Sequence, residues 1–422
     1  PRVKAMTTVE AGAKVWVADA EAAWVPATVV SLTPLKVAVD GKERVVAKAL
    51  PRNTGKAADV RDLVTLPHLN EPGMLHVLRR RLETSAVYTS VGRDILLAVN
   101  PYREIPELYS LGGGGEFFRD DDDGDNDSSG SSSDSRSPHV YGMARRALKA
   151  LTATGKSQAI LISGESGAGK TETTKYVLRF LATTSTTGDL ERAVVLTNPA
   201  LEAFGNAKTL RNANSSRFGK WLAMNFENGR LKSSKIKTTL LEKMRCVRRA
   251  PGERGFHIFY QFPDLIDSIT ARGDSSSGAA TMDDDDNLLL KLRQQALDAI
   301  CGGDRGSSTS DVFDAVQGLA HLGSLEFHDE EESLLDEDAP HLAEAAAVFG
   351  RTASELRTAL LERRSSGVVV NNSLQAATRA RDACLKAAYA QLFDALVTKC
   401  NDLLGDDDDF DDKGPTAARK EE

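Results

Sequence analysis

The sequence is poor in the features that mark membrane-spanning, exported and metal-stapled proteins. No window approaches the roughly 18 apolar residues that a membrane-spanning helix needs, and no charged, apolar and small-residue leader opens the chain. Only four of its 422 residues are cysteine, they are widely spaced, and no C-x-x-C pair occurs, so neither a zinc site nor a disulfide framework is indicated. We therefore expect an intracellular, reducing setting and no membrane partner. Because the first residue is proline rather than methionine, we also expect a fragment.

Acidic residues are numerous but concentrated in short runs. The chain has 53 lysine and arginine residues against 61 aspartate and glutamate residues, a formal net charge of −8. Twelve of the carboxylates lie in tetra-aspartate runs at 120–123, 283–286 and 406–409. The rest of the chain is therefore mildly basic, and the overall acidity says little about partners.

Three low-complexity stretches contain these runs, at residues 112–138, 273–287 and 405–422. They consist mostly of glycine, aspartate, serine and other polar residues. Because so little apolar surface could offset the entropy lost on ordering, we expect each stretch to be a disordered surface loop or tail.

The N-terminal segment has the pattern of a small β domain. Short β-branched runs alternate with turn signals, which predicts an antiparallel barrel over residues 10–50. Trp16 and Trp24 fall within it, and we interpret them as part of the barrel core rather than as a peptide-binding face.

A helical pattern follows the barrel. It begins at a start signal in residues 70–72, and its arginine run at residues 79–81 is interpreted as a solvated face. The apolar residues at helical spacing are Leu75, Leu78 and Leu82. A short apolar strand is predicted after it, at residues 95–99.

The strongest signal lies in the middle of the chain. Residues 158–163 predict a buried strand, residues 164–171 (GESGAGKT) match the motif G-x-x-x-x-G-K-[ST], and residues 171–181 predict a helix. Strand, loop and helix in this order are the context that the motif requires. The motif therefore indicates a phosphate-binding loop.

Phosphate chemistry explains the residue types in this loop. Gly164, Gly167 and Gly169 permit backbone angles and close approaches that a Cβ would block. Their N–H groups can then surround phosphate oxygens at the positive N-terminus of a helix. Lys170 would reach the β- and γ-phosphates, and the Thr171 hydroxyl would ligate Mg²⁺.

A second polar segment lies downstream, at residues 206–218. It leads into a predicted strand at 220–226, an Asn228-Gly229 turn signal and a partner strand at 231–241. Small amides and hydroxyls between structured elements could complete a nucleotide site, although alone the segment would be an ordinary polar loop.

Together these two segments resemble the myosin motor head. Residues 164–171 are identical to the myosin phosphate loop, and residues 212–220 (NANSSRFGK) match the consensus of its switch I. Other segments that fit the family are residues 69–72, 100–102, 198–209, 241–243, 252–261, 321–327 and 381–383. Kinesins share the loop and the N-x-x-S-S-R pattern, but they follow its arginine with Ser-His, whereas Phe218 follows it here.

The resemblance implies a role for each matching switch I residue. Ser216 would be the second protein ligand of Mg²⁺ beside Thr171, and Ser215 would contact the γ-phosphate and the attacking water. Asn212 would contact a phosphate oxygen, and Arg217 would pair with a glutamate of switch II. The residues implied in catalysis are Lys170, Asn212, Ser215 and Arg217.

The resemblance also implies contacts on the nucleotide's other groups. Asn100 and Pro101 would border the adenine, with Arg103 nearby. The adenine-side tyrosine stays open, because Leu108 and Tyr109 compete for its place. The loop residues implied in nucleotide binding are Gly164, Glu165, Ser166, Gly167, Ala168, Gly169, Lys170 and Thr171.

Two parts of the family pattern bear on activity and on actin. Switch II, an Asp-x-x-Gly-Phe-Glu motif expected soon after Asn401, does not occur before Glu422, so we expect a truncated motor domain without part of the hydrolytic clamp. Residues 363–377 resemble a loop that contacts actin, and Ser366 falls near a position that is acidic or phosphorylatable in the family.

His257 is interpreted as a packed strand histidine and not as a base.

The sequence thus predicts an α/β fold of the P-loop NTPase type, with a mostly parallel sheet flanked by helices. An SH3-like barrel at residues 10–50 would precede a partial motor domain at 58–404. This domain would comprise a nucleotide-binding core at 58–245 and a helical upper actin-binding subdomain at 246–404.

The implied function is binding of ATP with Mg²⁺ within an actin-based motor that hydrolyses ATP. F-actin, bound weakly through the upper subdomain, and ATP or ADP would be the partners; no nucleic acid, membrane or light-chain partner is expected. The expected location is the cytoplasm, in association with the cytoskeleton. Two alternatives stay open: a truncated nucleotide-binding or actin-tethering module without turnover, and a kinesin-like P-loop ATPase.

Overall fold

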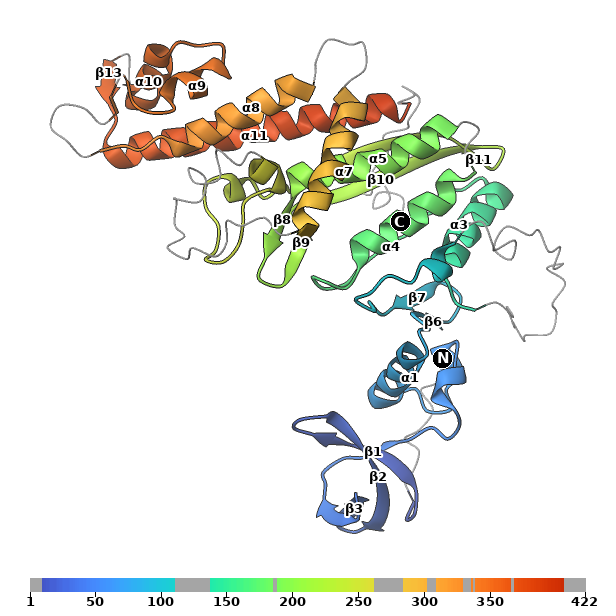
Figure 1. Cartoon of the computed structure of the whole chain (residues 1–422). Coiled ribbons are helices and arrows are strands. Elements are labelled where there is room, and N and C mark those ends of the chain that lie inside the picture. Colours follow the sequence, from blue (N-terminus) through green and yellow to red (C-terminus); the bar gives the residue numbers. More distant parts are fainter. Residues whose placement is uncertain are drawn as a thin grey trace. The chain divides into compact units, whose positions relative to one another are not determined.

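The computed structural model describes residues 10–110, 137–184, 188–261, 284–301, 309–328, 335–336, 338–365 and 368–405. The chain divides into two compact units, one ending at Val177 and one beginning at Leu178, and each is described by itself (Figure 1). Most of the three low-complexity stretches, and Ser366, lie outside the described residues. One part of the second stretch is described, and there the predicted loop is wrong: helix α7 (Asp284–Cys301) begins within it, anchored by Ala296 and Leu297 in the core.

The N-terminal unit begins with a small antiparallel sheet. Its strands are β1 (Lys14–Asp19), β2 (Ala23–Leu32), β3 (Leu35–Val39), β4 (Lys42–Val45) and β5 (Leu50–Pro51), in the spatial order β4-β3-β2-β1-β5. The antiparallel sheet predicted here is present. The closed barrel is not, because β4 and β5 are the two edges and share no ladder among the described residues.

Trp16 does not belong to the core of this sheet, contrary to the sequence interpretation. That core consists of Val15, Val17, Ala27, Val29 and Val37. Because side chains alternate along a strand, Trp16 lies on the opposite face of β1 from its two valine neighbours. It is nevertheless buried, and its ring packs against His76 with a centroid separation of 5.2 Å.

The rest of this unit is built from short helices and one hairpin. Its elements are η1 (Ala57–Asp59), η2 (Leu63–Thr65), α1 (Glu71–Glu83), β6 (Tyr88–Val91), β7 (Ile95–Ala98), η3 (Pro106–Tyr109), α3 (Val140–Thr154) and the start of α4 (Lys170–Ala182). The predicted start of α1 is confirmed, since the Asn70 side chain accepts a hydrogen bond from the Gly73 N–H.

The buried face of α1 differs from the predicted one. Val77 and Arg81 are buried, whereas Leu75 is half exposed. The Arg81 guanidinium donates to Thr89 Oγ1 at 2.9 Å and to the Tyr88 carbonyl at 2.8 Å. The arginine run is therefore not a uniformly solvated face: its last member is held by the β6 strand.

The strand predicted at residues 158–163 is not formed. These residues are irregular, and Leu161 is 89% exposed. A strand exists only when another segment pairs with it, and no described segment pairs with this one. The mostly parallel sheet is likewise not seen in the described residues, where every ladder is antiparallel and one isolated parallel bridge joins Asp62 and Ser90.

The second unit combines three hairpins and a helical part. Its strands are β8 (Asn206–Thr209), β9 (Asn212–Ser216), β10 (Gly219–Glu227), β11 (Arg230–Thr239), β12 (Glu362–Ser365) and β13 (Val368–Asn371). Its helices, besides α7, are α5 (Gly188–Gly205), η4 (Lys243–Cys246), η5 (His257–Gln261), α8 (Thr309–Ser324), α9 (Leu342–Ala347), α10 (Ala353–Leu361) and α11 (Leu374–Leu403). The predicted hairpin is confirmed: Asn228 and Gly229 have φ angles of +52° and +75° between β10 and β11.

Helix α11 organises the core of this unit. It lies along α8 (Figure 1), and its Tyr389 side chain is fully buried. The Tyr389 hydroxyl donates to the Phe204 carbonyl at 2.7 Å, and its ring stacks on Phe256 with a centroid separation of 4.9 Å. Near the end of the helix, the Asn401 amide exchanges two hydrogen bonds with the backbone of Ile236 on β11. These contacts join α5, β11 and α11.

We predict that Tyr389→Phe destabilises the protein by about 1–3 kcal/mol, because the buried Phe204 carbonyl loses its donor. Urea unfolding measures the effect. Thr398→Ala, which removes an exposed hydrogen bond on the same helix, should change stability by less than about 0.5 kcal/mol. Equal stability of Tyr389→Phe and the parent chain would contradict the assigned role of this hydroxyl.

Candidate nucleotide-binding site

The loop at residues 164–171 has the backbone that its glycines predict. Gly167 and Gly169 have φ angles of +80° and +86°, a region that residues with a side chain adopt only under strain. At Gly164, an added Cβ would lie 3.0 Å from the Ala168 Cβ. The chain then enters α4, as predicted, and the helix buries Val177, Phe180 and Leu181.

Lys170 reaches back over this loop. Its ammonium donates to the carbonyl oxygens of Gly164 at 2.6 Å and Glu165 at 2.8 Å. Lys170 and Thr171 open α4, where the first backbone N–H groups have no acceptor within the helix. A positive charge and a set of N–H donors therefore meet at one short loop, which suits a polyphosphate.

Asn100 connects a distant segment to the loop. Its side-chain amide donates to the Gly167 carbonyl at 2.7 Å, and its Oδ1 accepts from the Tyr102 N–H at 3.0 Å. The structure thus brings Asn100, and Pro101 beside it, to the loop. Arg103 is directed elsewhere, because its guanidinium donates to Ser85 Oγ at 2.6 Å.

An aromatic cluster lies against the start of α4. The rings of Tyr109 and Tyr176 stack with a centroid separation of 3.5 Å and an interplanar angle of 2°. The hydroxyls of Tyr109 and Tyr88 lie 2.9 Å apart, and His139 Nε2 lies 3.1 Å from the Leu108 carbonyl. Of the two candidates for the adenine-side residue, Tyr109 therefore offers a ring and Leu108 a carbonyl.

Burial decides the charge state of this cluster. It lowers the pKa of His139 to about 4 and raises the pKa of Tyr176 to about 12, so both side chains are neutral at pH 7. The sequence pattern did not indicate that Tyr176 belongs to this cluster. Its position on α4, one turn before the buried Phe180, was the available signal.

The switch I-like segment forms strand β9, paired with β8. Its centre is an amide network: Asn214 Oδ1 accepts from Asn206 Nδ2 at 3.0 Å, and Asn214 Nδ2 donates to Glu202 Oε2 at 3.0 Å. Asn206 Oδ1 in turn accepts from the Ser216 hydroxyl at 3.0 Å. The Asn212 side chain accepts from the Asn214 N–H. The network therefore fixes the backbone that carries the serine pair.

The two serines have different surroundings. Ser215 is 8% exposed, and its hydroxyl lies 3.4 Å from a guanidinium nitrogen of Arg217. Ser216 is exposed. Arg217 forms its ion pair with Glu242, which also binds Arg245. Although burial alone would raise the pKa of Glu242, the hydrogen bonds from Arg245 and Arg217 lower it. The resemblance implied a switch II glutamate for Arg217; among the described residues its partner is Glu242.

His257 supports the amide network from behind. It is buried, as predicted, but it lies in η5 and not in a strand. Its Nε2 lies 3.1 Å from Asn214 Oδ1, and it donates there because an amide oxygen can only accept. Burial, reinforced by nearby arginine and lysine charges, lowers the pKa of His257 to about 3.

The predicted site residues thus form two groups, one in each unit, and each group is described by itself. The first group consists of Asn100 and the loop at residues 164–171, including Lys170. The second group consists of Asn212, Ser215, Ser216 and Arg217. In the described ranges, no cluster of three or more His, Cys, Asp or Glu side chains could hold a metal ion. No helix in the same ranges has the length and apolarity needed to cross a bilayer.

Comparison with known proteins gives consistent matches. The family model for the myosin head (motor domain) matches residues 60–413. Myosin-14 and Myosin-17 of Arabidopsis thaliana are 34% and 35% identical to this chain, over 96% and 94% of its length. Myosin-51 of Schizosaccharomyces pombe is 35% identical over 84% of it. These alignments cover 28%, 27% and 25% of the relatives, so the chain spans about a quarter of their length.

We predict that His257 makes stability fall with acidity. Its pKa is about 3 in the folded protein and about 6.5 when unfolded, so the unfolded chain binds the proton first as pH falls below 6.5. At pH 5 this should cost about 1–2 kcal/mol relative to pH 7. Urea unfolding measures the free energy of unfolding at both pH values. Between pH 7 and pH 5, His257→Gln should lose about 1–2 kcal/mol less of it than the parent chain. His328→Gln, at an exposed position, should lose as much as the parent chain. The same pH dependence in all three proteins would refute this assignment.

Proposed function

Since this chain belongs to the myosin head family, we propose that it binds ATP with Mg²⁺ as the nucleotide-binding part of an actin-based motor that hydrolyses ATP. The observation that supports this most directly is the Lys170 ammonium held against the Gly164 and Glu165 carbonyls at the start of α4. Neither the module without turnover nor the kinesin-like ATPase gains support, because the matching family model and relatives are myosins.

The triphosphate would bind in the loop by exchanging partners with Lys170. A charged hydrogen bond to phosphate is stronger than one to a neutral carbonyl, so the ammonium would leave Gly164 and Glu165 for the β- and γ-phosphates. The N–H groups of the loop would bind the remaining oxygens at the positive end of α4. Glycine at 164, 167 and 169 leaves room for this close approach.

The purine would lie beside Asn100 and Pro101. Asn100 is already hydrogen-bonded to the loop. We assign the adenine-side aromatic contact to Tyr109 and not to Leu108, because the Tyr109 ring stacks on Tyr176 of α4. Arg103 would have to leave Ser85 to take part.

Thr171 and Ser216 would hold Mg²⁺. Their hydroxyl oxygens are hard ligands of the kind that Mg²⁺ accepts, with phosphate oxygens and waters completing its shell. The exposed position of Ser216 fits this role. When bound, Mg²⁺ neutralises charge on the β- and γ-phosphate oxygens.

Hydrolysis would depend on position and charge rather than on covalent chemistry. Ser215 is buried beside Arg217 and would orient the attacking water. Asn212 and Lys170 would stabilise charge on the transferred phosphoryl group. Arg217, through its ion pair with Glu242, would hold the serine segment in place.

We assign the domains as the sequence predicts them: 10–50 the small β domain, 58–245 the nucleotide-binding core and 246–404 the upper actin-binding subdomain. The hairpin β12–β13 would contribute to F-actin contact, because Val368 and Val369 at its tip are 63% and 52% exposed. ADP would be the bound product, and the protein would act in the cytoplasm on the cytoskeleton.

We predict that Lys170→Ala weakens MgATP binding about 100-fold, since removing a charged hydrogen-bonding partner costs about 2–3 kcal/mol. Titration calorimetry measures the affinity. Lys175→Ala, which alters an exposed ion pair with Glu172 on the same helix, should bind MgATP like the parent chain. Retained affinity in Lys170→Ala would exclude the loop as the phosphate site.

Turnover and the response to actin are tested in the same proteins. Phosphate release by the parent chain should be measurable and should increase with F-actin, and Lys170→Ala should release none above background. If MgATP binds but phosphate release stays at background with and without F-actin, the motor activity proposed for this chain is wrong while nucleotide binding stands.

We predict that Tyr109→Ala weakens MgATP binding about 5- to 30-fold, because an aromatic contact worth about 1–2 kcal/mol is lost. Tyr109→Phe keeps the ring and should stay within about threefold of the parent chain, as should Leu108→Ala. A loss confined to Leu108→Ala would instead place Leu108 at the adenine.

A further inference from the structure

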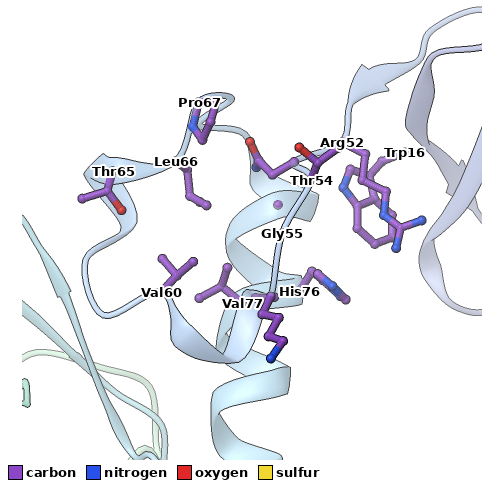
Figure 2. Close-up of a pocket in the computed structure, with 14 residues that line it drawn as sticks. Trp16, Arg52, Thr54, Gly55, Val60, Thr65, Leu66, Pro67, His76 and Val77 are labelled. Carbon is purple, nitrogen blue, oxygen red and sulfur yellow. The ribbon is translucent and has the colours of Figure 1, made fainter.

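A pocket of about 100 Å³ lies in the N-terminal unit, between strand β1 and helix α1. Figure 2 shows Trp16, Arg52 and His76 on one side of it and Val60, Thr65 and Leu66 on the other, with Gly55 between them. None of these residues belongs to the two groups of predicted site residues described above. The pocket is therefore a separate feature that the proposed function does not use.

Trp16, one of the residues that line the pocket, carries an unpaired buried donor. Its side chain is 6% exposed, and its indole Nε1 is buried without a hydrogen-bond partner among the described residues. Buried N–H groups are nearly always paired, because leaving one unpaired is unfavourable. An acceptor atom that reached Nε1 from the pocket would remove that penalty.

The charges around Trp16 are of one sign. The Arg52 guanidinium lies over the indole ring, 5.0 Å from its centroid, and Lys56 also lines the pocket. No aspartate or glutamate is among the residues that line it. Asn53 is already engaged, since its amide exchanges two hydrogen bonds with the backbone of His68. The pocket thus offers donors and positive charge, and it lacks a counter-charge of its own.

His76 adds a neutral, polar edge. Burial, reinforced by the Arg52 charge, lowers the pKa of His76 below its ordinary value. This shift favours the uncharged imidazole, and Arg52 and Lys56 are the cationic side chains of the pocket. On the far side, Leu66 and Val77 are buried and give the pocket an apolar wall.

We propose that this pocket binds a small aliphatic carboxylate, whose oxygens accept from Trp16 Nε1 and pair with Arg52 while its alkyl part lies on Leu66 and Val77. The volume sets the size, because it is smaller than the roughly 150 Å³ cavity that holds benzene. A free acid of about four carbons, or the side chain of a glutamate, has this chemistry and size.

The test uses the whole chain with Trp16 as its single tryptophan, excited selectively over the tyrosines. The chain has three tryptophans, Trp16, Trp24 and Trp221, so Trp24→Phe with Trp221→Phe leaves only the residue in the pocket. Butyrate is titrated at constant ionic strength, with butyramide as the uncharged isostere and N-acetyl-glutamate amide as the side-chain mimic. We expect a saturable change of Trp16 emission with butyrate or the glutamate mimic, and at least tenfold weaker binding of butyramide.

Arg52→Gln in the same background should weaken carboxylate binding at least tenfold. Lys42→Gln, an exposed change on β4, is the matched control and should bind like its parent. Both variants should bind MgATP normally, which separates this result from that of the proposed function.

Binding of only the glutamate mimic would make a protein side chain the source of the carboxylate. Equal binding of butyrate and butyramide, or binding that Arg52→Gln leaves unchanged, would overturn the proposal, as would no saturable change with either acid.

Discussion

A backbone turn at positive φ, which glycine adopts without strain, governs the loop at residues 164–171. With Gly167 and Gly169 at positive φ, the chain folds sharply enough for Lys170 to reach the carbonyls of Gly164 and Glu165 from the first turn of α4. The same turn presents the Gly167 carbonyl to Asn100, 67 residues earlier in the chain. The backbone preference of two glycines therefore positions a tertiary contact. Lys170, the first turn of α4 and the Asn100 amide all lie against this one loop.

The residues around strand β9 obey a different constraint, the need to pair buried polar groups. Asn206 donates one hydrogen bond to the Asn214 side chain, which also bonds to Glu202 and His257. Burial keeps His257 neutral, so it can donate without introducing a charge. Because side chains alternate along strand β9, Ser215 is buried and Ser216 is exposed, a difference that matters if the two have separate tasks.

The chain contains two different sets of groups that suit anions. The loop at residues 164–171 relies on backbone N–H groups and a helix end, which suit the many oxygens of a polyphosphate. The Trp16 pocket relies on an indole N–H, a guanidinium and an apolar wall, which suit a single carboxylate with an alkyl part. The difference follows from desolvation: a multiply charged ligand needs many donors, whereas a small monoanion can be satisfied by two or three.

Local signals in the sequence were sufficient to predict four features: the glycine loop at residues 164–171, helix α4, the start of α1 at Asn70 and the hairpin at Asn228-Gly229. Each depends on backbone angles, helix capping or periodicity, which act over a few residues. They could not settle whether residues 158–163 pair with anything, since a strand needs a partner elsewhere in the chain. Only the tertiary structure decided that Arg81 is held by β6, that Tyr109 meets Tyr176, that Arg217 pairs with Glu242 and that Trp16 faces a pocket. Each of these depends on residues brought together by packing, and an apolar or charged side chain does not specify by itself which distant neighbour it will contact.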